Sequence, residues 1–311
     1  MREIKETFNF YDQTYLKSYN LDRAIQYQLN LLNSLDLYTR QHSENVATIA
    51  CNLCKKLHLS RGFTEYCTIC AYLHDIGKLF MPPSILQKPS KLTDEEYDTM
   101  KKHTTFGYKL CIKDSKLRPY YAGAYYHHEC LDGTGYPQGL VKKDIPFEAQ
   151  IIKVADEYEA LVSKRQYKSH IGITDALKII IEHTKPSPDA LPNTEYSKIG
   201  KNNKKIVKKL FKVVIDDIEY EISCSYDYVK FLAKELNRYK KIKHYIKKRD
   251  SAKNDKKRVY FEEYAKLYLH SGESIEELDN LYQETSEAYE LRKNILDDLY
   301  KEIKSIKKLR V

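Results

Sequence analysis

The sequence predicts an all-α protein, and three features carry that prediction. Apolar residues recur at every third or fourth position along most of the 311 residues, which is the spacing of helices with one buried face. Capping boxes begin two of these runs, with Thr93 followed by Glu96 and Ser274 followed by Glu277. A proline-rich stretch, 186–192, separates a first set of helices from a second.

The helices of the first set are bounded by their apolar patterns and by the polar residues at their ends. The expected helices are, in chain order, 22–37, a run opened by His42, a run ending at Leu73, a run capped by Thr93, a run through Asp156, and 174–183. Three of these helices carry or precede a histidine, at His42, His74 and His103.

The second set is rich in lysine. Its apolar spacing predicts helices over 206–215, over 226–245 and from Ser274 to Ile306, whereas 218–222 alternates and is expected to form a short strand. The basic run 240–258 is interpreted as a solvated helix end and linker. We therefore expect an N-terminal extension at 1–20, a helical domain at 21–185, and a mainly helical C-terminal region at 186–311.

Composition narrows the classes of function. The net charge of +9 suits anionic partners but is too dispersed for a protein that binds duplex nucleic acid. No segment approaches the ~20 apolar residues of a membrane helix, and no apolar signal follows Met1. With seven cysteines, an odd number, we expect a cytoplasmic protein with reduced thiols and no membrane contact of its own.

Four cysteines form two pairs with zinc-ribbon spacing, Cys51 with Cys54 and Cys67 with Cys70. Each pair falls inside a helical apolar pattern, and neither has a glycine-bearing knuckle around it. Because free cysteine packs as a small hydrophobic residue, we expect these side chains to lie in the core.

Histidines and carboxylates recur where helices end. His127 and His128 run directly into the bent loop Glu129-Cys130-Leu131-Asp132-Gly133-Thr134-Gly135-Tyr136-Pro137. Asp156 ends an apolar run, and burying it would be costly unless it were paired or bound to a metal. In His74-Asp75-Ile76-Gly77-Lys78, a nitrogen and a carboxylate stand side by side, and we expect Gly77 to let the backbone turn sharply behind them. Mixed nitrogen and oxygen donors of this kind suit Fe, Mn or Zn.

Together these motifs resemble the HD-GYP family of bacterial phosphodiesterases, a branch of the HD-domain metal-dependent phosphohydrolases. The resemblance spans about 36–183 and rests on motifs at Tyr38-Thr39-x-x-His42, His74 to Lys78, His103 with Gly107, His127 to Pro137, Val154-Ala155-Asp156, and Arg165-x-Tyr167-Lys168. It implies a helical bundle, two divalent metal ions, and hydrolysis of cyclic di-GMP to pGpG or GMP. Fe or Mn is the expected metal, with Zn, Ni and Mg as alternatives.

The resemblance also assigns roles to residues. It implies that Asp75 bridges two ions, with His42, His74 and Asp156 on one, and His103, His127 and His128 on the other. Asp75 and Lys78 are then the catalytic residues, and Glu129 is expected to orient a ligand histidine. The residues expected to contact the substrate are Lys78, Arg165, Lys168, Gly133, Gly135 and Tyr136.

Three positions depart from the family pattern. Members with a third metal carry a glutamate four residues before the first histidine, and this chain has Tyr38 there, which favours two metals. Gln150 stands where an arginine is usual, and Glu159 where the carboxylate is often aspartate. None of these positions is an expected metal ligand.

Two alternatives remain open at this point. One is an enzyme of the same class with another substrate, such as cyclic GMP-AMP or a mononucleotide. The other is a catalytically silent sensor of cyclic dinucleotides that signals through its helical tail, although the intact ligand set argues against it. The apolar stripe Leu278, Leu281, Ala288, Leu291, Ile295, Leu299, Ile303 and Ile306 predicts that the tail packs on its own chain or forms a homodimer.

Overall fold

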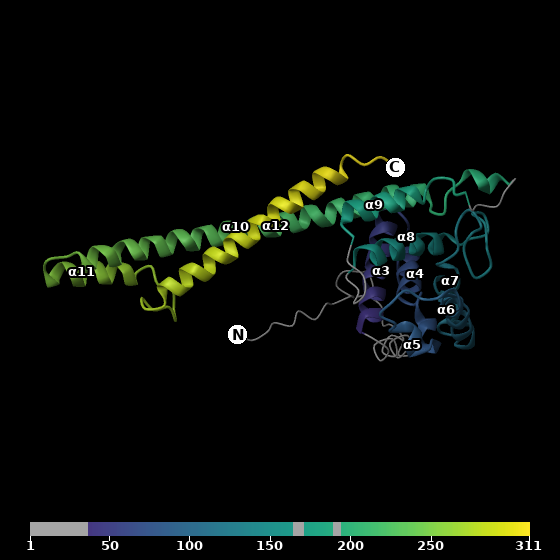
Figure 1. Cartoon of the computed structure of the whole chain (residues 1–311), viewed down its shortest axis with the longest axis horizontal. Helices are drawn as coiled ribbons and strands as arrows, with labels where there is room; N and C mark the ends of the chain where they lie inside the picture. The colour runs from purple at the N-terminus through teal and green to yellow at the C-terminus, as the bar shows by residue number, and fades with distance from the viewer. Residues whose placement is uncertain (1–36, 164–170, 189–193) are drawn as a thin grey trace. The chain divides into compact units, whose positions relative to one another are not determined.

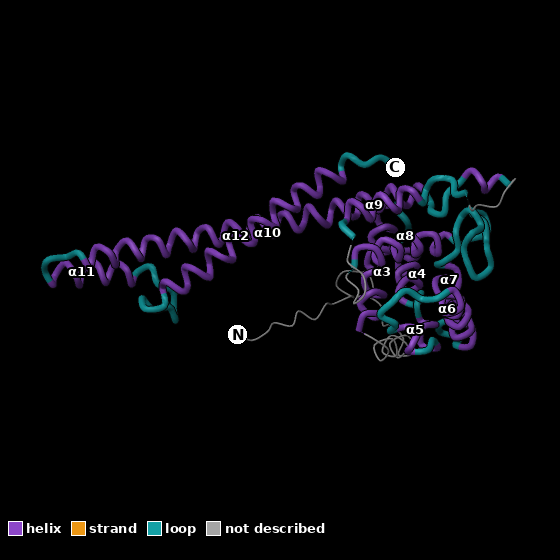
Figure 2. The backbone as a smooth tube through the Cα atoms, viewed as in Figure 1, coloured by secondary structure: helices purple, strands orange, loops and turns teal. Residues whose placement is uncertain are grey.

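A computed structural model of the chain describes residues 37–163, 171–188 and 194–311. These residues form helices and no β-strand (Figure 2); a single antiparallel bridge joins Asp132 to Val141. The all-α prediction is confirmed. The first expected helix, 22–37, lies almost entirely outside the described residues, as do Arg165 and Lys168.

The chain divides into two compact units, residues 1–214 with 309–311, and residues 215–308. The division falls inside one continuous helix, α10 (Lys204–Asp250), in which the expected helices 206–215 and 226–245 are joined. The expected domain boundary near Pro186 stays a prediction. Among the described residues, none of the helices has the length and apolar content needed to span a bilayer.

The first unit is a bundle of helices (Figure 1). Its helices are α3 (Leu37–Lys56), α4 (Arg61–Tyr72), η2 (Ile76–Phe80), α5 (Pro83–Leu86), α6 (Asp94–Lys113), η3 (Arg118–Tyr120), α7 (Tyr121–Tyr126), α8 (Phe147–Val162), α9 (Ile173–Glu182) and η4 (Glu195–Lys198). Helix α3 packs on α4 and α8, and α6 packs on η2 and α7. Large side chains such as Leu53, Leu73 and Ile152 are fully buried and form the core.

The paired cysteines lie in this core. Cys51, Cys54, Cys67 and Cys70 are fully buried free thiols on α3 and α4. The expectation that they pack as apolar residues is confirmed, because the helical pattern around them turns each pair inward.

The second unit contains the rest of α10, together with α11 (Asp255–Lys266) and α12 (Leu278–Ile306). Helix α12 runs antiparallel to α10. Lys243 pairs with Asp279 at 2.7 Å, and Lys307 pairs with Glu219 at 3.0 Å, so residue numbers rise along one helix as they fall along the other. An apolar cluster of Tyr239, Ile242, Ala265 and Leu278 joins α10, α11 and the start of α12.

Two expectations for this unit were wrong. The segment 218–222 is helical, because Ile218 and Ile222 stand one turn apart on a partly buried face while Tyr220, between them, is 74% exposed. The helix expected from Ser274 begins only at Leu278, and its N-cap residue, Glu277, makes no side-chain capping hydrogen bond. In the apolar stripe of this helix, Leu278, Ile303 and Ile306 are buried, whereas Leu291 is 61% exposed.

Candidate metal centre

Five helical elements bring the seven expected metal ligands together. His42 comes from α3, His74 and Asp75 follow α4, His103 lies on α6, His127 and His128 follow α7, and Asp156 lies on α8. Three groups have ligand atoms within 4.8 Å of one another: His42 with His74 and Asp75, His103 with His127 and His128, and His74 with His127 and Asp156. The chain positions of these residues span more than a hundred residues, so only the fold joins them.

Close contact between backbones places Asp75 beside His103. A Cβ added to Gly77 would lie 1.8 Å from the carbonyl oxygen of His103 and 2.5 Å from the amide nitrogen of Gly107. Gly77 therefore serves close packing of η2 on α6. This corrects the expectation of a sharp turn, because Gly77 is not among the described residues with positive φ.

Backbone carbonyls fix the tautomers of three histidines. The Nδ1 atoms of His74, His103 and His127 lie 2.7, 2.7 and 2.8 Å from the carbonyl oxygens of Ala71, Met100 and Gly123. A carbonyl oxygen only accepts, so each Nδ1 carries the hydrogen, and in the neutral ring Nε2 presents its lone pair to the centre. This is how histidines that bind metals through Nε2 are commonly held.

The Nε2 atoms then face one another without a donor between them. Those of His103 and His127 are 3.3 Å apart, and Nε2 of His74 is buried with no hydrogen-bond partner. Two lone pairs at this distance repel unless a cation lies between them. Nitrogens that bind one metal ion at about 2.1 Å lie roughly 3.0 to 3.4 Å apart at ordinary ligand angles. The arrangement therefore fits a metal ion.

Asp75 presents one carboxylate oxygen to each side of the centre. Its Oδ2 lies 3.6 Å from Nε2 of His42 and 3.3 Å from Nε2 of His74. Its Oδ1 lies 3.4 Å from Nε2 of His103 and 3.9 Å from Nε2 of His127. Asp156 completes the first side, with Oδ1 at 3.1 Å from Nε2 of His42. A carboxylate placed in this way can bridge two cations.

The charges of the site suit metal binding. Burial alone would raise the pKa of Asp75, but Lys78 and His74 outweigh it and hold the pKa well below its usual range. Asp156 shows the same balance, with His42 as the opposing group. Burial lowers the pKa values of His103, His127 and His128. Ionised carboxylates beside neutral imidazoles are the protonation states that metal ligation needs.

Glu159 contacts the centre, although the motifs did not single it out as a site residue. Its Oε2 accepts a hydrogen bond from Nδ1 of His42, and its Oε1 accepts from the side-chain amide of Asn45 at 2.9 Å. Glu159 lies one helical turn after Asp156 on α8, so both carboxylates face α3. That spacing was a usable signal, because a ligand histidine commonly donates the N–H of its second nitrogen to a carboxylate.

Glu129 holds the loop and not a histidine, which corrects the expected role. Its two carboxylate oxygens accept from the amides of Gln138 at 2.7 Å and Leu140 at 2.8 Å. The loop is compact, because a Cβ on Gly135 would lie 2.2 Å from the amide nitrogen of Cys130, while Gly133 has φ +81°. Tyr136 stacks on His128 with ring centroids 4.6 Å apart. The loop is thereby fastened to the histidine cluster.

Lys78 forms an ion pair with Oδ2 of Asp75, and its side chain is 20% exposed. Its ammonium group thus lies at the edge of the centre, where an anionic ligand can reach it. The other two expected phosphate-binding cations, Arg165 and Lys168, lie outside the described residues.

We expect metal binding to release a proton from His42. Burial lowers the pKa of His42, but hydrogen bonds to Asp156 and Glu159 outweigh it and raise the pKa to about 9. The metal-free imidazole is therefore protonated at pH 7 and must lose that proton to bind a metal. Between pH 7 and 9, metal affinity should rise about tenfold per pH unit. Calorimetric titration in buffers of different ionisation enthalpy measures the released proton; heats independent of the buffer would contradict the assignment.

Replacing Glu159 by glutamine should weaken metal binding by about 10- to 100-fold, because the second nitrogen of His42 loses its carboxylate partner. Glu157→Gln is a matched control on the same helix. Glu157 also accepts a hydrogen bond from a histidine, but that residue is His183, which is not part of the centre. Metal content after dialysis at fixed free metal distinguishes the two variants. Equal losses would mean that Glu159 acts only through the stability of α8.

The part of the chain that carries this cluster matches known proteins. Residues 26–189 match the family model described as HD domain. The chain is 37% identical over 155 residues to a cyclic di-GMP phosphodiesterase of Thermotoga maritima, covering 49% of this chain and 42% of that protein. It is 41% identical over 151 residues to the cyclic di-GMP phosphodiesterase response regulator RpfG of Xanthomonas campestris, covering 48% and 38%.

A third relative differs in its named substrate. The 3'3'-cGAMP-specific phosphodiesterase 1 of Vibrio cholerae is 34% identical over 154 residues, covering 49% of this chain and 35% of that protein. The chain therefore spans less than half the length of each of these curated relatives.

Proposed function

The chain belongs to the HD domain family, and from that premise we propose that it is a metal-dependent phosphodiesterase that hydrolyses cyclic di-GMP to pGpG, GMP or both. The observation that carries the proposal is Asp75, whose two oxygens face two separate groups of imidazole nitrogens. The names of two relatives support the substrate.

The proposed centre holds two divalent ions. His42, His74 and Asp156 would hold one ion, His103, His127 and His128 would hold the other, and Asp75 would be shared between them. The nitrogen and oxygen donors suit Fe or Mn, with Zn, Ni and Mg as alternatives. When bound, the ions supply a hydroxide near neutral pH and neutralise the charge of the phosphodiester.

The side chains around the centre position the substrate. Lys78, already at the edge of the centre, shifts its ammonium group toward a phosphoryl oxygen, and Arg165 holds phosphate in a bidentate fork. Lys168 adds a third positive charge. The loop residues Gly133, Gly135 and Tyr136 line the approach, since Tyr136 already stacks on His128. Together these three cations would neutralise the charge of the substrate.

A second substrate deserves a direct test, because one relative is named for cyclic GMP-AMP. The protein, purified without oxygen and analysed for metal, is incubated with cyclic di-GMP, cyclic GMP-AMP and cyclic di-AMP, and the products are separated by chromatography. Cyclic di-GMP should be consumed fastest and give pGpG or GMP. Faster consumption of cyclic GMP-AMP would reassign the substrate, and binding without any product would favour the silent sensor.

The assembly of the protein is a separate proposal. Leu291 is 61% exposed on α12, and a homodimer through the C-terminal helices would cover it. Light scattering of the chain and of Leu291→Glu tests this, because a monomeric mass in both proteins rules out the dimer. The cytoplasmic location expected from the sequence stays a prediction.

A further inference from the structure

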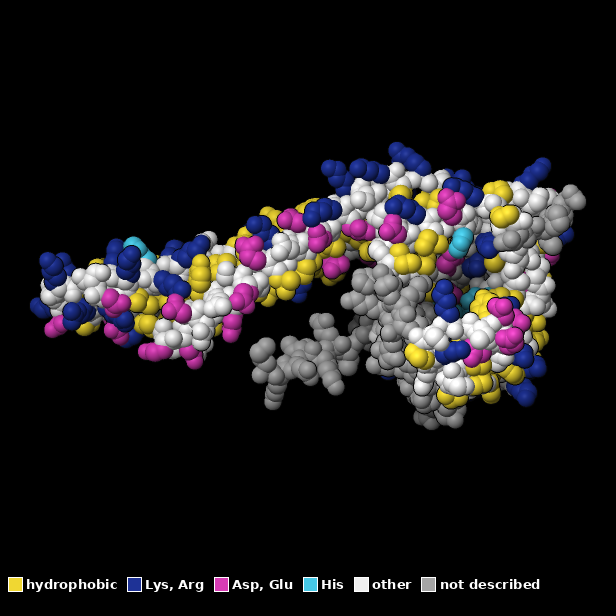
Figure 3. All heavy atoms as spheres, viewed as in Figure 1, with side chains coloured by type: hydrophobic (Ala, Val, Ile, Leu, Met, Phe, Trp, Pro, Cys, Tyr) yellow, Lys and Arg dark blue, Asp and Glu magenta, His cyan; other side chains and the backbone are white. Residues whose placement is uncertain are grey.

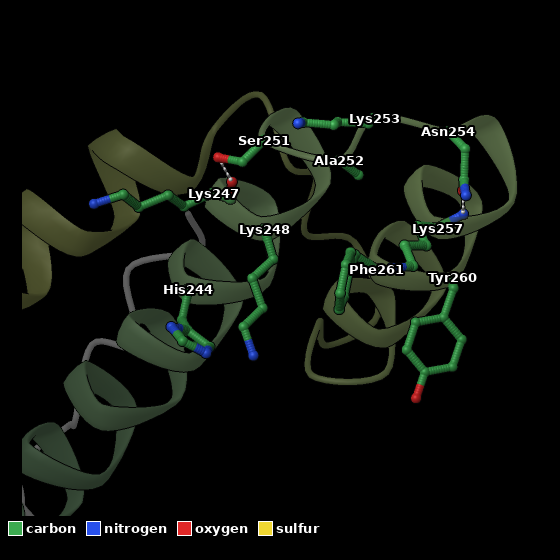
Figure 4. A pocket seen from close by; sticks show the side chains of 10 residues that line it. All are labelled: His244, Lys247, Lys248, Ser251, Ala252, Lys253, Asn254, Lys257, Tyr260 and Phe261. Atoms are coloured by element: carbon green, nitrogen blue, oxygen red, sulfur yellow. Dashed lines mark hydrogen bonds between the residues drawn. The ribbon is translucent and has the colours of Figure 1, made fainter.

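The second unit contains a cavity of about 710 Å³ where α10 ends and α11 begins (Figure 4). Its lining residues are His244, Lys247, Lys248, Ser251, Ala252, Lys253, Asn254, Lys257, Tyr260 and Phe261. All of them belong to the described part of the second unit, and none belongs to the metal centre. The volume lies in the range typical of small-molecule sites.

The charge of this cavity is one-sided. Four of its lining residues are lysines, and no lining residue is a carboxylate. In Figure 3, Lys and Arg side chains gather at this end of the unit, with acidic side chains beside them. The basic run 240–258 is therefore more than a solvated helix end, because part of it surrounds a concave surface.

The neighbouring acidic residues Asp250 and Asp255 form ion pairs with arginines that do not line the cavity. Asp250 pairs with Arg249 at 2.9 Å, and Asp255 pairs with Arg258 at 3.5 Å. Among the described residues, none of the four lining lysines forms an ion pair. Several ammonium groups gathered without ion-pair partners of their own repel one another, and an anion bound among them relieves that repulsion.

Aromatic rings stand beside the cations. Nζ of Lys248 lies 5.8 Å from the centroid of Phe261, and Figure 4 shows the two side chains facing each other across the cavity. Tyr260 is 54% exposed, and its ring lies 5.4 Å from that of Phe261. Exposed aromatic rings next to ammonium groups are the combination that binds a nucleobase together with its phosphates.

We propose that this cavity binds a nucleotide that carries two or more phosphates. One phosphate monoester carries a charge of about −1.5 to −2, so the four lysines match more than one phosphate. The base stacks on Tyr260 or Phe261, and Ser251 and Asn254, in the turn between the two helices, also line the cavity. The site is separate from the catalytic chemistry, so its test does not depend on hydrolysis.

Calorimetric titration of the whole chain in EDTA tests the proposal with three probes: GTP, inorganic tripolyphosphate and guanosine. Chelation keeps metal out of the catalytic centre. GTP should bind with one site per chain, and about fivefold or more tightly than tripolyphosphate, because only GTP can stack. Guanosine should bind weakly. Equal affinity for GTP and tripolyphosphate would overturn the nucleotide assignment and leave a general anion site.

Charge variants locate the site. Lys248→Glu with Lys257→Glu should weaken GTP binding by about tenfold or more. The matched control is Lys230→Glu with Lys234→Glu, which makes the same charge change on exposed lysines of α10 that do not line the cavity. Equal losses in both double variants would mean diffuse attraction and would overturn the proposal. Circular dichroism confirms that each variant is folded.

An aromatic variant separates stacking from charge. Tyr260→Ala should weaken GTP binding and leave tripolyphosphate binding unchanged. Tyr226→Ala is the matched control, because Tyr226 is also 54% exposed but lies on α10 away from the cavity lining. If Tyr260→Ala and Phe261→Leu both left GTP affinity unchanged, the base would not bind where we place it and the proposal would fail.

Discussion

Replacing Asp75 by alanine is expected to remove both of the proposed metal ions and nearly all of the proposed hydrolysis. Asp75 is 2% exposed, and it is the residue whose two oxygens face both groups of imidazoles. Without Asp75, the histidine nitrogens of both groups remain, but the negative charge that offsets the charge of the two cations is lost. Losing one hydrogen-bond donor that stabilises transition-state charge lowers the rate about 10²- to 10³-fold. Losing the whole centre should therefore lower the rate of hydrolysis by more than ~10³-fold.

Metal content by mass spectrometry and product formation from cyclic di-GMP measure this result together. Asp175→Ala is the control, because it also removes a carboxylate that pairs with a lysine, but Asp175 is exposed on α9, which carries none of the expected metal ligands. Asp75→Asn keeps the volume of the side chain and guards against misfolding. If either Asp75 variant retained two metals per chain and full turnover, the bridging role would be wrong.

Gly77→Ala is expected to damage both folding and the centre. The new Cβ would lie 1.8 Å from the carbonyl oxygen of His103, and that atom is backbone, which cannot rotate away. Overpacking of this kind costs about 1 to 3 kcal/mol of unfolding free energy. Relief requires η2 and α6 to separate, which moves Asp75 away from His103. The group of His103, His127 and His128 should therefore lose metal before the group of His42 and His74.

Gly62→Ala is the matched control for this variant. Gly62 lies in α4, and beyond its chain neighbours and the backbone of its own helix no atom lies within 4 Å of a Cβ added there, so alanine should change stability by less than about 1 kcal/mol. Thermal unfolding and metal content are measured for both variants. A Gly77→Ala protein as stable and as metal-rich as Gly62→Ala would show that η2 can move without disturbing the site.

The helices and the ligand set were predictable from the sequence for local reasons. Helical periodicity and capping boxes act within a few residues, and the box at Thr93 and Glu96 is present as expected. Histidines at helix ends, such as His74 and His103, were recognisable because their motifs are short and ordered along the chain. The prediction of a strand at 218–222 was wrong because it also relied on a short stretch of sequence. Five residues of alternation fit one face of a long helix as well as they fit a strand.

What the sequence by itself determined was the helical fold class, the apolar environment of the four paired cysteines, and a set of nitrogen and oxygen donors in chain order. Only the tertiary structure decided which donors face each other, because those distances depend on how helices pack. Contact of η2 with α6 at Gly77 brings Asp75 to His103, and contact of α3 with α8 brings Glu159 to His42. The tertiary structure also decided that Glu129 holds the loop, because the amides of Gln138 and Leu140 reach the Glu129 carboxylate only after the chain folds back.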